Sequence, residues 1–419
     1  MRTTAVTDHP KTKLFYGWFV VAAAFVVTFI GFGSAYTFSS FVDSLQRDFG
    51  ASRGSVSLVF SFAGFLYFGL GMISGPLADR WGAKRLAAIG MALVGLGLML
   101  AGRAQTIVQV YAAYSIGIGA GVGCAYVPTL GAVQRWFVKR RGFASGLAVS
   151  GIGVGTLVMP PLATWLIASL GWRDAYLVLG FFAAIVGVGS SFLIADDPRR
   201  HGVGPDGAPL DPLASSPVRH GVSVREAVRT ARFAGLYATC LISAFGVFVP
   251  FVHLVPYAVD HQVAPAAAVL LLGTIGVGST AGRFFLGGIA DRVGRDAFLI
   301  AMYVGMAASL AIWAVAGGFW PLVGFALLFG VFYGGWVAIL PAVVTDHFGG
   351  RNVGGIIGIL YTSVAIGTLL GPSAAGFAFD ISHSYVFPVA ISAAANVVAA
   401  LIAVATMKTG SPIAAVVRS

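Results

Sequence analysis

A single arginine, Arg283, lies inside a long apolar stretch of the sequence. The twelve residues before it, Leu271 to Gly282, carry no charge, and Phe284-Phe285-Leu286 follow it. An arginine at the centre of a membrane helix costs about 2.5–3.5 kcal/mol on insertion scales. Its guanidinium does not neutralise itself by losing a proton. We therefore expect Arg283 to face a cavity and to bind an anion there.

Two groups that can titrate lie near the end of the preceding apolar stretch. His253 stands in the run His-Leu-Val-Pro-Tyr, and Asp260 follows seven residues later. The unperturbed pKa of histidine, near 6.5, suits a proton carrier, and a buried carboxyl can also hold a proton. We predict that both residues take part in proton coupling. Hydrogen bonding and packing would explain His253 equally well, and Asp260 could instead cap the outer end of its helix.

Five aromatic residues with polar tips could complete a pocket around an anion. Buried tyrosine and tryptophan usually find a hydrogen-bond partner, and a substrate carboxylate or hydroxyl would serve. Small residues flank three of them, which makes those three the better candidates for substrate binding: Tyr126, Tyr333 and Tyr361. The other two candidates are Tyr36 and Trp336. Ordinary helix packing is the alternative for each.

One octet occurs twice in the chain. Gly75-Pro76-Leu77-Ala78-Asp79-Arg80-Trp81-Gly82 is followed 212 residues later by Gly287-Gly288-Ile289-Ala290-Asp291-Arg292-Val293-Gly294. At the same offset, Gly155-Thr156-Leu157 with Pro160 recurs as Gly367-Thr368-Leu369 with Pro372, and Gly146 recurs as Gly358. Parallel repeats are typical of transporters whose halves rock about a central cavity. The equivalent of Arg283 is Gly71, so the fold does not need this cation.

We interpret the octets as a gate between the two halves. Glycine lets helices approach closely, and Asp and Arg at helix ends can pair with each other, with neighbouring charges or with helix dipoles. A turn that carries a topogenic charge is the simpler alternative. The predicted gating residues are Gly75, Asp79, Arg80, Gly82, Gly287, Asp291 and Arg292.

The composition places most of the chain in lipid. Of 419 residues, 58% are hydrophobic and 10% charged, whereas a soluble domain carries about 25% charged residues. We expect an all-α membrane protein with two six-helix halves around a central cavity. The expected spans are 15–40, 54–76, 86–103, 106–134, 143–168, 174–195, 233–259, 265–290, 297–316, 320–345, 353–378 and 384–407. The expected domains are 1–195 and 233–407, with a linker at 196–232 and a tail at 408–419.

The distribution of basic residues predicts the topology. With twelve spans, 21 of the 26 Lys and Arg residues fall on the side of both termini and only four on the other. This bias places the termini and the linker in the cytoplasm, and the membrane would be a bacterial inner membrane. It also explains the net charge of +11 without nucleic acid.

The sequence lacks the motifs that are typical of other functional classes. Cys124 and Cys240 lie in apolar segments and form neither a disulfide framework nor a metal-binding spacing. A Gly-x-x-x-x-Gly-Lys-Ser/Thr sequence, which would bind ATP phosphates, does not occur. The linker is too short to fold as a catalytic domain. We therefore expect no enzyme, no cofactor and no metal.

The octet resembles the signature loop of the major facilitator superfamily, and two other motifs resemble its monocarboxylate transporter branch. These motifs are Tyr16-Gly17-Trp18 and the run from Trp136 to Gly151. The resemblance implies a transporter, functional as a monomer, that moves small organic anions by alternating access. In that family an arginine of the eighth span binds the substrate carboxylate, and Arg283 matches it. Mammalian members have an aspartate four residues earlier, where this chain has Ser279.

The bacterial oxalate–formate exchangers also resemble this chain, but they use a second cation. Their lysine lies in the eleventh span, where Val364 stands here. One buried arginine balances one carboxylate, and a dianion would leave a net charge in low dielectric. A monocarboxylate such as lactate or pyruvate, moving with a proton, is therefore favoured. Exchange of the oxalate–formate type and proton-driven efflux of lipophilic cations are the alternatives, and the second usually needs an intramembrane acid.

Overall fold

A computed structural model describes residues 15–138, 140–209, 221–349 and 352–407 of the chain. Within these ranges the chain is helical, apart from loops and one isolated antiparallel bridge between Gly221 and Gly349. Twelve helical segments are long and apolar enough to cross a membrane. The expected all-α membrane fold with twelve spans is therefore confirmed. Part of the expected linker, 210–220, and the expected tail, 408–419, lie outside the described residues.

The first six spans are built from ten α-helices and two π-helical stretches. The π-helical stretches cover Tyr111–Ala120 and Ala183–Gly187. The α-helices are α1 (Gly17–Tyr36), α2 (Phe38–Phe49), α3 (Arg53–Gly69), α4 (Gly71–Trp81), α5 (Ala83–Gly102), α6 (Ile107–Val110), α7 (Gly121–Trp136), α8 (Arg141–Leu170), α9 (Trp172–Phe182) and α10 (Val188–Ser191).

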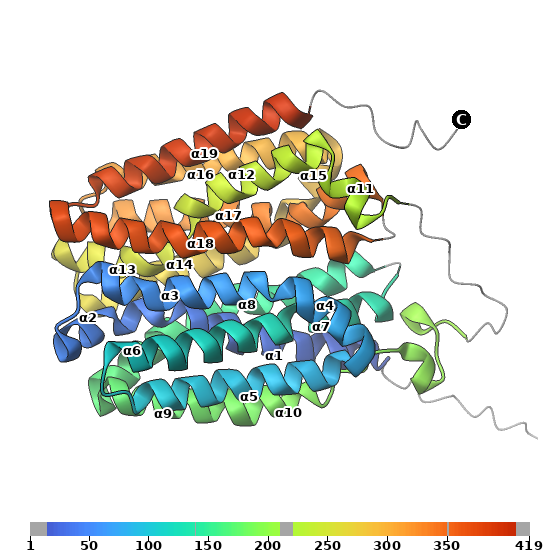
Figure 1. Cartoon of the computed structure of the whole chain (residues 1–419), viewed down its shortest axis with the longest axis horizontal. Helices are drawn as coiled ribbons and strands as arrows, with labels where there is room; N and C mark the ends of the chain where they lie inside the picture. Colours follow the sequence, from blue (N-terminus) through green and yellow to red (C-terminus); the bar gives the residue numbers. More distant parts are fainter. Residues whose placement is uncertain (1–14, 139, 210–220, 350–351, 408–419) are drawn as a thin grey trace, which may run out of the picture.

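The last six spans follow two short 3-10 turns, Pro198–His201 and Pro205–Gly207, and the helix α11 (Val224–Val228). The helices of these spans are α12 (Ala231–Val247), α13 (Val249–Asp260), α14 (Pro265–Phe285), α15 (Gly287–Val293), α16 (Arg295–Val315), α17 (Phe319–Phe348), α18 (Val353–Ser382) and α19 (Val386–Met407). In Figure 1 they lie above the first six spans, and α11 lies at the right-hand end of the molecule. We call this end the linker end and the opposite end, which holds the α2–α3 turn, the far end.

Two of the expected span boundaries differ most from the structure. The first span, expected to end at residue 40, continues as α2 to Phe49. The polar residues of α2 lower its hydropathy, so the sequence did not predict that the span continues into it. Helix α2 nevertheless buries Phe38, Phe41 and Leu45 on one face, while Asp43 is exposed. The eighth span, expected to reach residue 290, breaks at Leu286.

The halves pack mainly through two helix pairs, α3 on α18 and α8 on α14, with smaller contacts of α4 on α18 and of α2 on α13. Glycines allow the close contact in both pairs. A Cβ on Gly376 of α18 would lie 2.8 Å from Gly54 Cα on α3, and a Cβ on Gly276 of α14 would meet the Gly153 carbonyl oxygen of α8. Close approach through small residues is a common way to join membrane helices. These two pairs form the walls between which a central cavity lies.

The repeat predicted from the octets is visible in the backbone. α4 and α15 both end on the last glycine of an octet, with φ 87° and ψ 143° at Gly82 and φ 93° and ψ 135° at Gly294. This left-handed φ favours glycine. After Gly82, the Asp196 carboxylate accepts a 2.6 Å hydrogen bond from the amide of Ala83 and so caps α5. The first-half turn is thus tied to the end of its sixth span.

The two motifs that resemble the monocarboxylate transporter branch lie against each other. The Tyr16 ring lies 5.5 Å from the Trp136 ring, and the Trp18 ring lies 4.9 Å from the Phe137 ring. The imidazole of His201 stacks on Tyr16 at 4.4 Å. These contacts join the start of α1 to the end of α7 and to the linker, which indicates that the motifs anchor the linker end of the first half.

Candidate binding cavity

A cavity lies between the halves and contains the predicted arginine. Its volume is ≈ 20 Å³, room for about one water molecule, so this conformation is closed around the site. Helices α1, α3, α7 and α8 of the first half and α14, α17 and α18 of the second half line it. The lining residues are Phe32, Phe68, Tyr126, Ile152, Arg283, Tyr333, Trp336, Val337, Leu340, Tyr361 and Val364.

Arg283 lies in the last turn of α14, and only 7% of its surface is exposed. Its Nη1 donates a 3.4 Å hydrogen bond to the Val149 carbonyl of α8. Its Nε and Nη2 are buried and have no hydrogen-bond partner among the described residues. These two nitrogens share one edge of the guanidinium, and such an edge fits the two oxygens of a carboxylate. A buried donor left unpaired costs about 1–3 kcal/mol, so this edge favours a bound anion.

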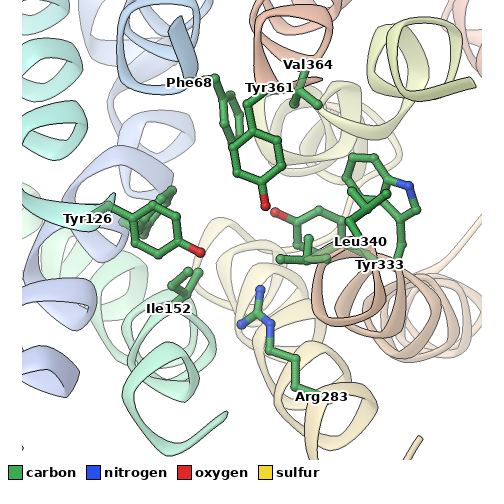
Figure 2. Close-up of a pocket in the computed structure, with 11 residues that line it drawn as sticks. Phe68, Tyr126, Ile152, Arg283, Tyr333, Leu340, Tyr361 and Val364 are labelled. Carbon is green, nitrogen blue, oxygen red and sulfur yellow. The ribbon is translucent and has the colours of Figure 1, made fainter. Parts of the chain in front are cut away.

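The three tyrosines preferred from the sequence all line the cavity with Arg283. Figure 2 shows the hydroxyls of Tyr126, Tyr333 and Tyr361 directed toward the same space as the guanidinium. The three come from α7, α17 and α18, so both halves contribute. A ligand bound to Arg283 can therefore receive hydrogen bonds from either side of the molecule.

The other two aromatic candidates are placed differently. Tyr36 is not among the residues that line the cavity. Its hydroxyl forms a 3.1 Å hydrogen bond with the Tyr333 hydroxyl, and its ring stacks on Phe251 at 4.4 Å. Trp336 lines the cavity, but its buried Nε1 has no hydrogen-bond partner among the described residues. Tyr36 thus orients Tyr333 from behind, across the boundary between the halves.

The rest of the lining is apolar. Phe32, Phe68, Ile152, Val337 and Leu340 surround the tyrosines, and Val364 lies on α18 at the position where a second cation was considered. Arg283 is the one charged residue of the cavity lining as described. The cavity can therefore balance a single negative charge while it excludes water from the rest of the ligand.

His253 lies outside the cavity and is fully partnered. Its Nε2 donates a 2.8 Å hydrogen bond to the Pro372 carbonyl of α18 and lies 3.3 Å from Ser57 Oγ of α3. Its Nδ1 lies 2.9 Å from the Tyr385 hydroxyl. Since a carbonyl only accepts, Nε2 carries a hydrogen and a neutral His253 accepts from Tyr385 at Nδ1. Of these contacts, the one with Ser57 crosses from α13 to the first half, while Pro372 and Tyr385 hold the imidazole within the second half.

Asp260 also joins the halves. It ends α13, and its two carboxylate oxygens accept hydrogen bonds of 2.5 and 2.8 Å from the Arg53 guanidinium of α3. The sequence reasoning placed Arg53 in a loop on the outer side and did not connect it with Asp260. The sequence does show that Arg53 immediately precedes one expected span and that Asp260 ends another. Their pairing could not be predicted, because it depends on how α3 packs against the second half.

The helices that carry the predicted gating residues, α4 and α15, lie toward the linker end in different halves (Figure 1). Gly75 is half-buried against Val127, and Arg80 and Arg292 are exposed. The side chains of Asp79 and Asp291, and the surroundings of Gly287, lie outside the described part of the structure. The gating role of this set stays a prediction.

Comparison with known proteins decides the family. The family model for the Major Facilitator Superfamily matches residues 24–287 and 236–415. The chain belongs to the major facilitator superfamily. This facilitator is similar over most of its length to monocarboxylate transporter 11 of Homo sapiens, which is 27% identical over 395 residues that cover 90% of this chain and 80% of the relative. It is also similar to monocarboxylate transporter 3 of Rattus norvegicus, which is 29% identical over 377 residues that cover 88% of this chain and 75% of the relative.

Two more relatives extend these findings. Monocarboxylate transporter 12-B of Danio rerio is 28% identical over 399 residues, which cover 88% of this chain and 82% of the relative. The crystal structure of a bacterial homolog to the human lysosomal transporter Spinster superposes with a TM-score of 0.69 at 16% identity, over 95% of this chain and 98% of that one. The facilitator is thus a secondary transporter, not an enzyme, and is distantly related to the monocarboxylate transporters.

Proposed function

We propose that this facilitator carries small monocarboxylates, of the lactate or pyruvate kind, across a membrane by alternating access. The observation that carries the proposal is the Nε–Nη2 edge of Arg283, which finds no partner among the described residues and lies in a closed, largely apolar cavity. A carboxylate satisfies both donors at once. The names of the relatives point to the same class of substrate.

The substrate carries one negative charge. Removing one partner of a buried ion pair costs about 3–5 kcal/mol, and a second carboxylate would have no cation opposite it in this lining. The tyrosine hydroxyls suit a 2-hydroxy or 2-oxo group next to the carboxylate. The apolar walls suit a short hydrocarbon remainder.

Transport is coupled to a proton in this proposal, with His253 and Asp260 as the coupling residues. Both lie on α13 and contact α3 of the other half, so a change in their charge acts directly on the contact between the halves. The excess of basic residues supports a cytoplasmic position for the linker and both termini, with the spans in a bacterial inner membrane. The octets act as a gate at the linker end, and the protein works as a monomer.

Exchange of one carboxylate for another is the second candidate. It is favoured by the cavity lining, in which the described residues include neither an acid nor a histidine that could accept a proton beside the substrate. Preloaded vesicles distinguish the two. Counter-substrate accelerates uptake by an exchanger even at equal pH on both sides.

The proposal is tested by uptake of labelled L-lactate into liposomes with an imposed pH gradient. We expect Arg283→Ala to lower the apparent affinity by about 100-fold or more, because about 3–5 kcal/mol is lost when a buried carboxylate has no partner. Arg103→Gln, which removes an exposed cation after α5, is the matched control and keeps full uptake. Equal uptake by the parent protein and Arg283→Ala would rule out the assigned site.

A further inference from the structure

A second hollow lies next to the cavity and inside the first half, between α1, α5 and α7. Its lining includes Val27, Thr28, Gly31, Met91 and Val122. Phe32 of α1 and Tyr126 of α7 line this hollow and also line the cavity that contains Arg283. The two spaces therefore share a wall made of two aromatic side chains. We call the hollow the side pocket.

The wall between the cavity and the side pocket consists of two rings in contact. The rings of Phe32 and Tyr126 meet edge to face, with their centres 5.1 Å apart. Figure 2 shows the Tyr126 hydroxyl directed toward the same space as the guanidinium of Arg283, while the Tyr126 ring also borders the side pocket. Because the two rings come from different helices, a turn of either ring would open a passage between the two spaces.

The side pocket is apolar and begins close to the cation. Apart from Tyr126, its one residue with a polar side chain is Thr28, whose hydroxyl already donates a 2.7 Å hydrogen bond to the Ala148 carbonyl of α8. The next residue of α8, Val149, accepts the hydrogen bond from Arg283. The same turn of α8 therefore borders the cation on one side and the side pocket on the other. A ligand whose carboxylate is bound by Arg283 can extend an apolar chain into this space.

In the second half, a tyrosine fills the place that corresponds to the side pocket. The repeat holds for the helices themselves, because α5 begins 212 residues before α16. At this offset Met91 corresponds to Tyr303, and Val27 corresponds to Thr239. Tyr303 is fully buried, and its hydroxyl donates a 3.1 Å hydrogen bond to Thr239. The fold therefore accepts a side chain as large as tyrosine here, where the first half has only a methionine.

The first half has its aromatic side chains at the wall instead. Phe32 and Tyr126 correspond to Ala244 and Ala338 of the second half. Bulk that fills the interior of one half is thus moved, in the other half, to the two residues that separate the side pocket from the cavity. This difference between the halves indicates that the space behind the wall has a use in the first half.

The side pocket is closed in this conformation, but its boundaries can adapt. Its volume is ≈ 0 Å³, and the cavity has room for about one water molecule, so a substrate of any size requires side chains to move. A Cβ on Gly31 would lie 3.2 Å from Val122 Cγ2 and 3.6 Å from Met91 Cε. These neighbours are the ends of side chains and not backbone. Methionine is unbranched and repacks easily around an apolar group, so the side pocket can widen at Met91.

We propose that the side pocket receives the hydrocarbon chain of a monocarboxylate that Arg283 binds by its carboxylate, and that Gly31 and Met91 set the chain length. The occupant is a 2-hydroxy or 2-oxo acid with a straight chain longer than the methyl group of lactate. Each methylene that leaves water for the apolar lining strengthens binding about fourfold. This inference rests on the proposed function, because it takes Arg283 as the carboxylate site.

The test measures how binding depends on chain length. Labelled L-lactate is bound to the full chain in detergent and is displaced by unlabelled L-lactate, 2-hydroxybutanoate or 2-hydroxyhexanoate of the same configuration. We expect 2-hydroxyhexanoate to displace the label at a concentration at least about tenfold lower than L-lactate does. Its three additional methylenes would strengthen binding about 60-fold if no side chain had to move. The ratio of the two concentrations is the quantity compared between variants.

Two variants fill the side pocket from different helices. Gly31→Val adds a side chain from α1, and Met91→Phe brings in a ring like that of Tyr303 in the second half. We expect each variant to reduce the ratio at least about fivefold, because the longer chain loses its space. Gly131→Val is the matched control, since Gly131 of α7 has open space around it. It keeps the ratio of the parent protein and corrects for any uptake of the acids by detergent.

The possible outcomes separate this inference from the proposed function. A parent ratio near one, with lactate bound, overturns the side pocket and leaves the proposed function in place. A high ratio that Gly31→Val and Met91→Phe both keep places the chain elsewhere and also overturns the side pocket. Failure of the parent protein to bind labelled lactate or to be protected by any of the acids contradicts the proposed function itself, and the side pocket falls with it.

Discussion

At the scale of single residues, the cavity is defined by what surrounds one guanidinium. Nη1 of Arg283 donates to the Val149 carbonyl, and its Nε–Nη2 edge has no hydrogen-bond partner in the part of the chain that the structure describes. Tyrosine hydroxyls supply neutral hydrogen bonds, which help to orient a ligand without adding charge. Charge balance then has the largest influence on binding, because an unbalanced charge in an apolar lining costs several kcal/mol. Selectivity for the charge of the substrate should therefore respond to a single added cation.

Val364→Lys adds that cation on α18, opposite Arg283 in the cavity lining. We expect the variant to bind oxalate at least about tenfold more tightly relative to lactate than the parent protein does, because a second cation balances the second carboxylate. Thermal stabilisation by each anion in detergent measures the ratio. Val364→Met, which changes shape without charge, should leave the preference for lactate unchanged. An unchanged ratio in Val364→Lys would mean that charge balance does not select the substrate.

At the scale of helices, two close contacts set the geometry of the site. Helices α8 and α14 meet at Gly153 and Gly276. Gly153 directly follows Ile152, which lines the cavity, and lies one turn after Val149, which accepts the hydrogen bond from Arg283. The same contact therefore holds Arg283 in place. A wedge in it should disturb both stability and binding.

Gly153→Val is such a wedge, since even a Cβ would collide with the Thr280 side chain. We expect it to lower the free energy of unfolding by about 1–3 kcal/mol, the usual cost of overpacking, and to weaken lactate binding. Thermal unfolding in detergent, followed with and without lactate, measures both effects. Gly146→Val on the same helix has open space around it and should change neither. If the two variants behave alike, the α8–α14 contact does not position the site.

The rotation of each helix about its own axis could not be predicted from the sequence. Hydropathy and the repeat were enough for twelve spans and for a cavity around Arg283, because both depend on composition along one helix. Rotation about a helix axis depends on its neighbours. Tyr36 and Tyr333 look alike in sequence, yet Phe251 stacks on Tyr36 and keeps it behind the cavity. The contacts of Asp380, near the end of α18, could not be predicted either, because its partners are backbone amides at the start of α3, for which no residue type is a signal.

At the scale of the whole molecule, the cation of the cavity and the ion pair of Asp260 with Arg53 lie in different places. Arg283 lies in the cavity between the halves, whereas Asp260 joins the halves at the far end. In the proposed symport, substrate and proton therefore bind without touching. Each would bias the same equilibrium between closed and open forms, which is what thermodynamic coupling requires.

This arrangement makes a prediction about the electrical character of transport. If one monoanion and one proton cross together, no net charge moves. A membrane potential of 100 mV would act on one uncompensated charge with about 2.3 kcal/mol, which corresponds to roughly a 50-fold change in accumulation. We therefore expect lactate accumulation in liposomes to be unchanged by a potassium diffusion potential of this size. A pH difference of one unit should by contrast support about tenfold accumulation.

The two gradients separate the competing mechanisms. Accumulation that follows the potential would mean that the carboxylate crosses with more or fewer charges than one proton can offset, and would contradict neutral symport. Accumulation that follows neither gradient, but rises with preloaded carboxylate, would indicate exchange. Asp260→Asn sharpens the comparison, because in neutral symport it should weaken the response to the pH gradient while Arg283 still binds lactate. An unchanged response to the pH gradient would contradict the coupling role of Asp260.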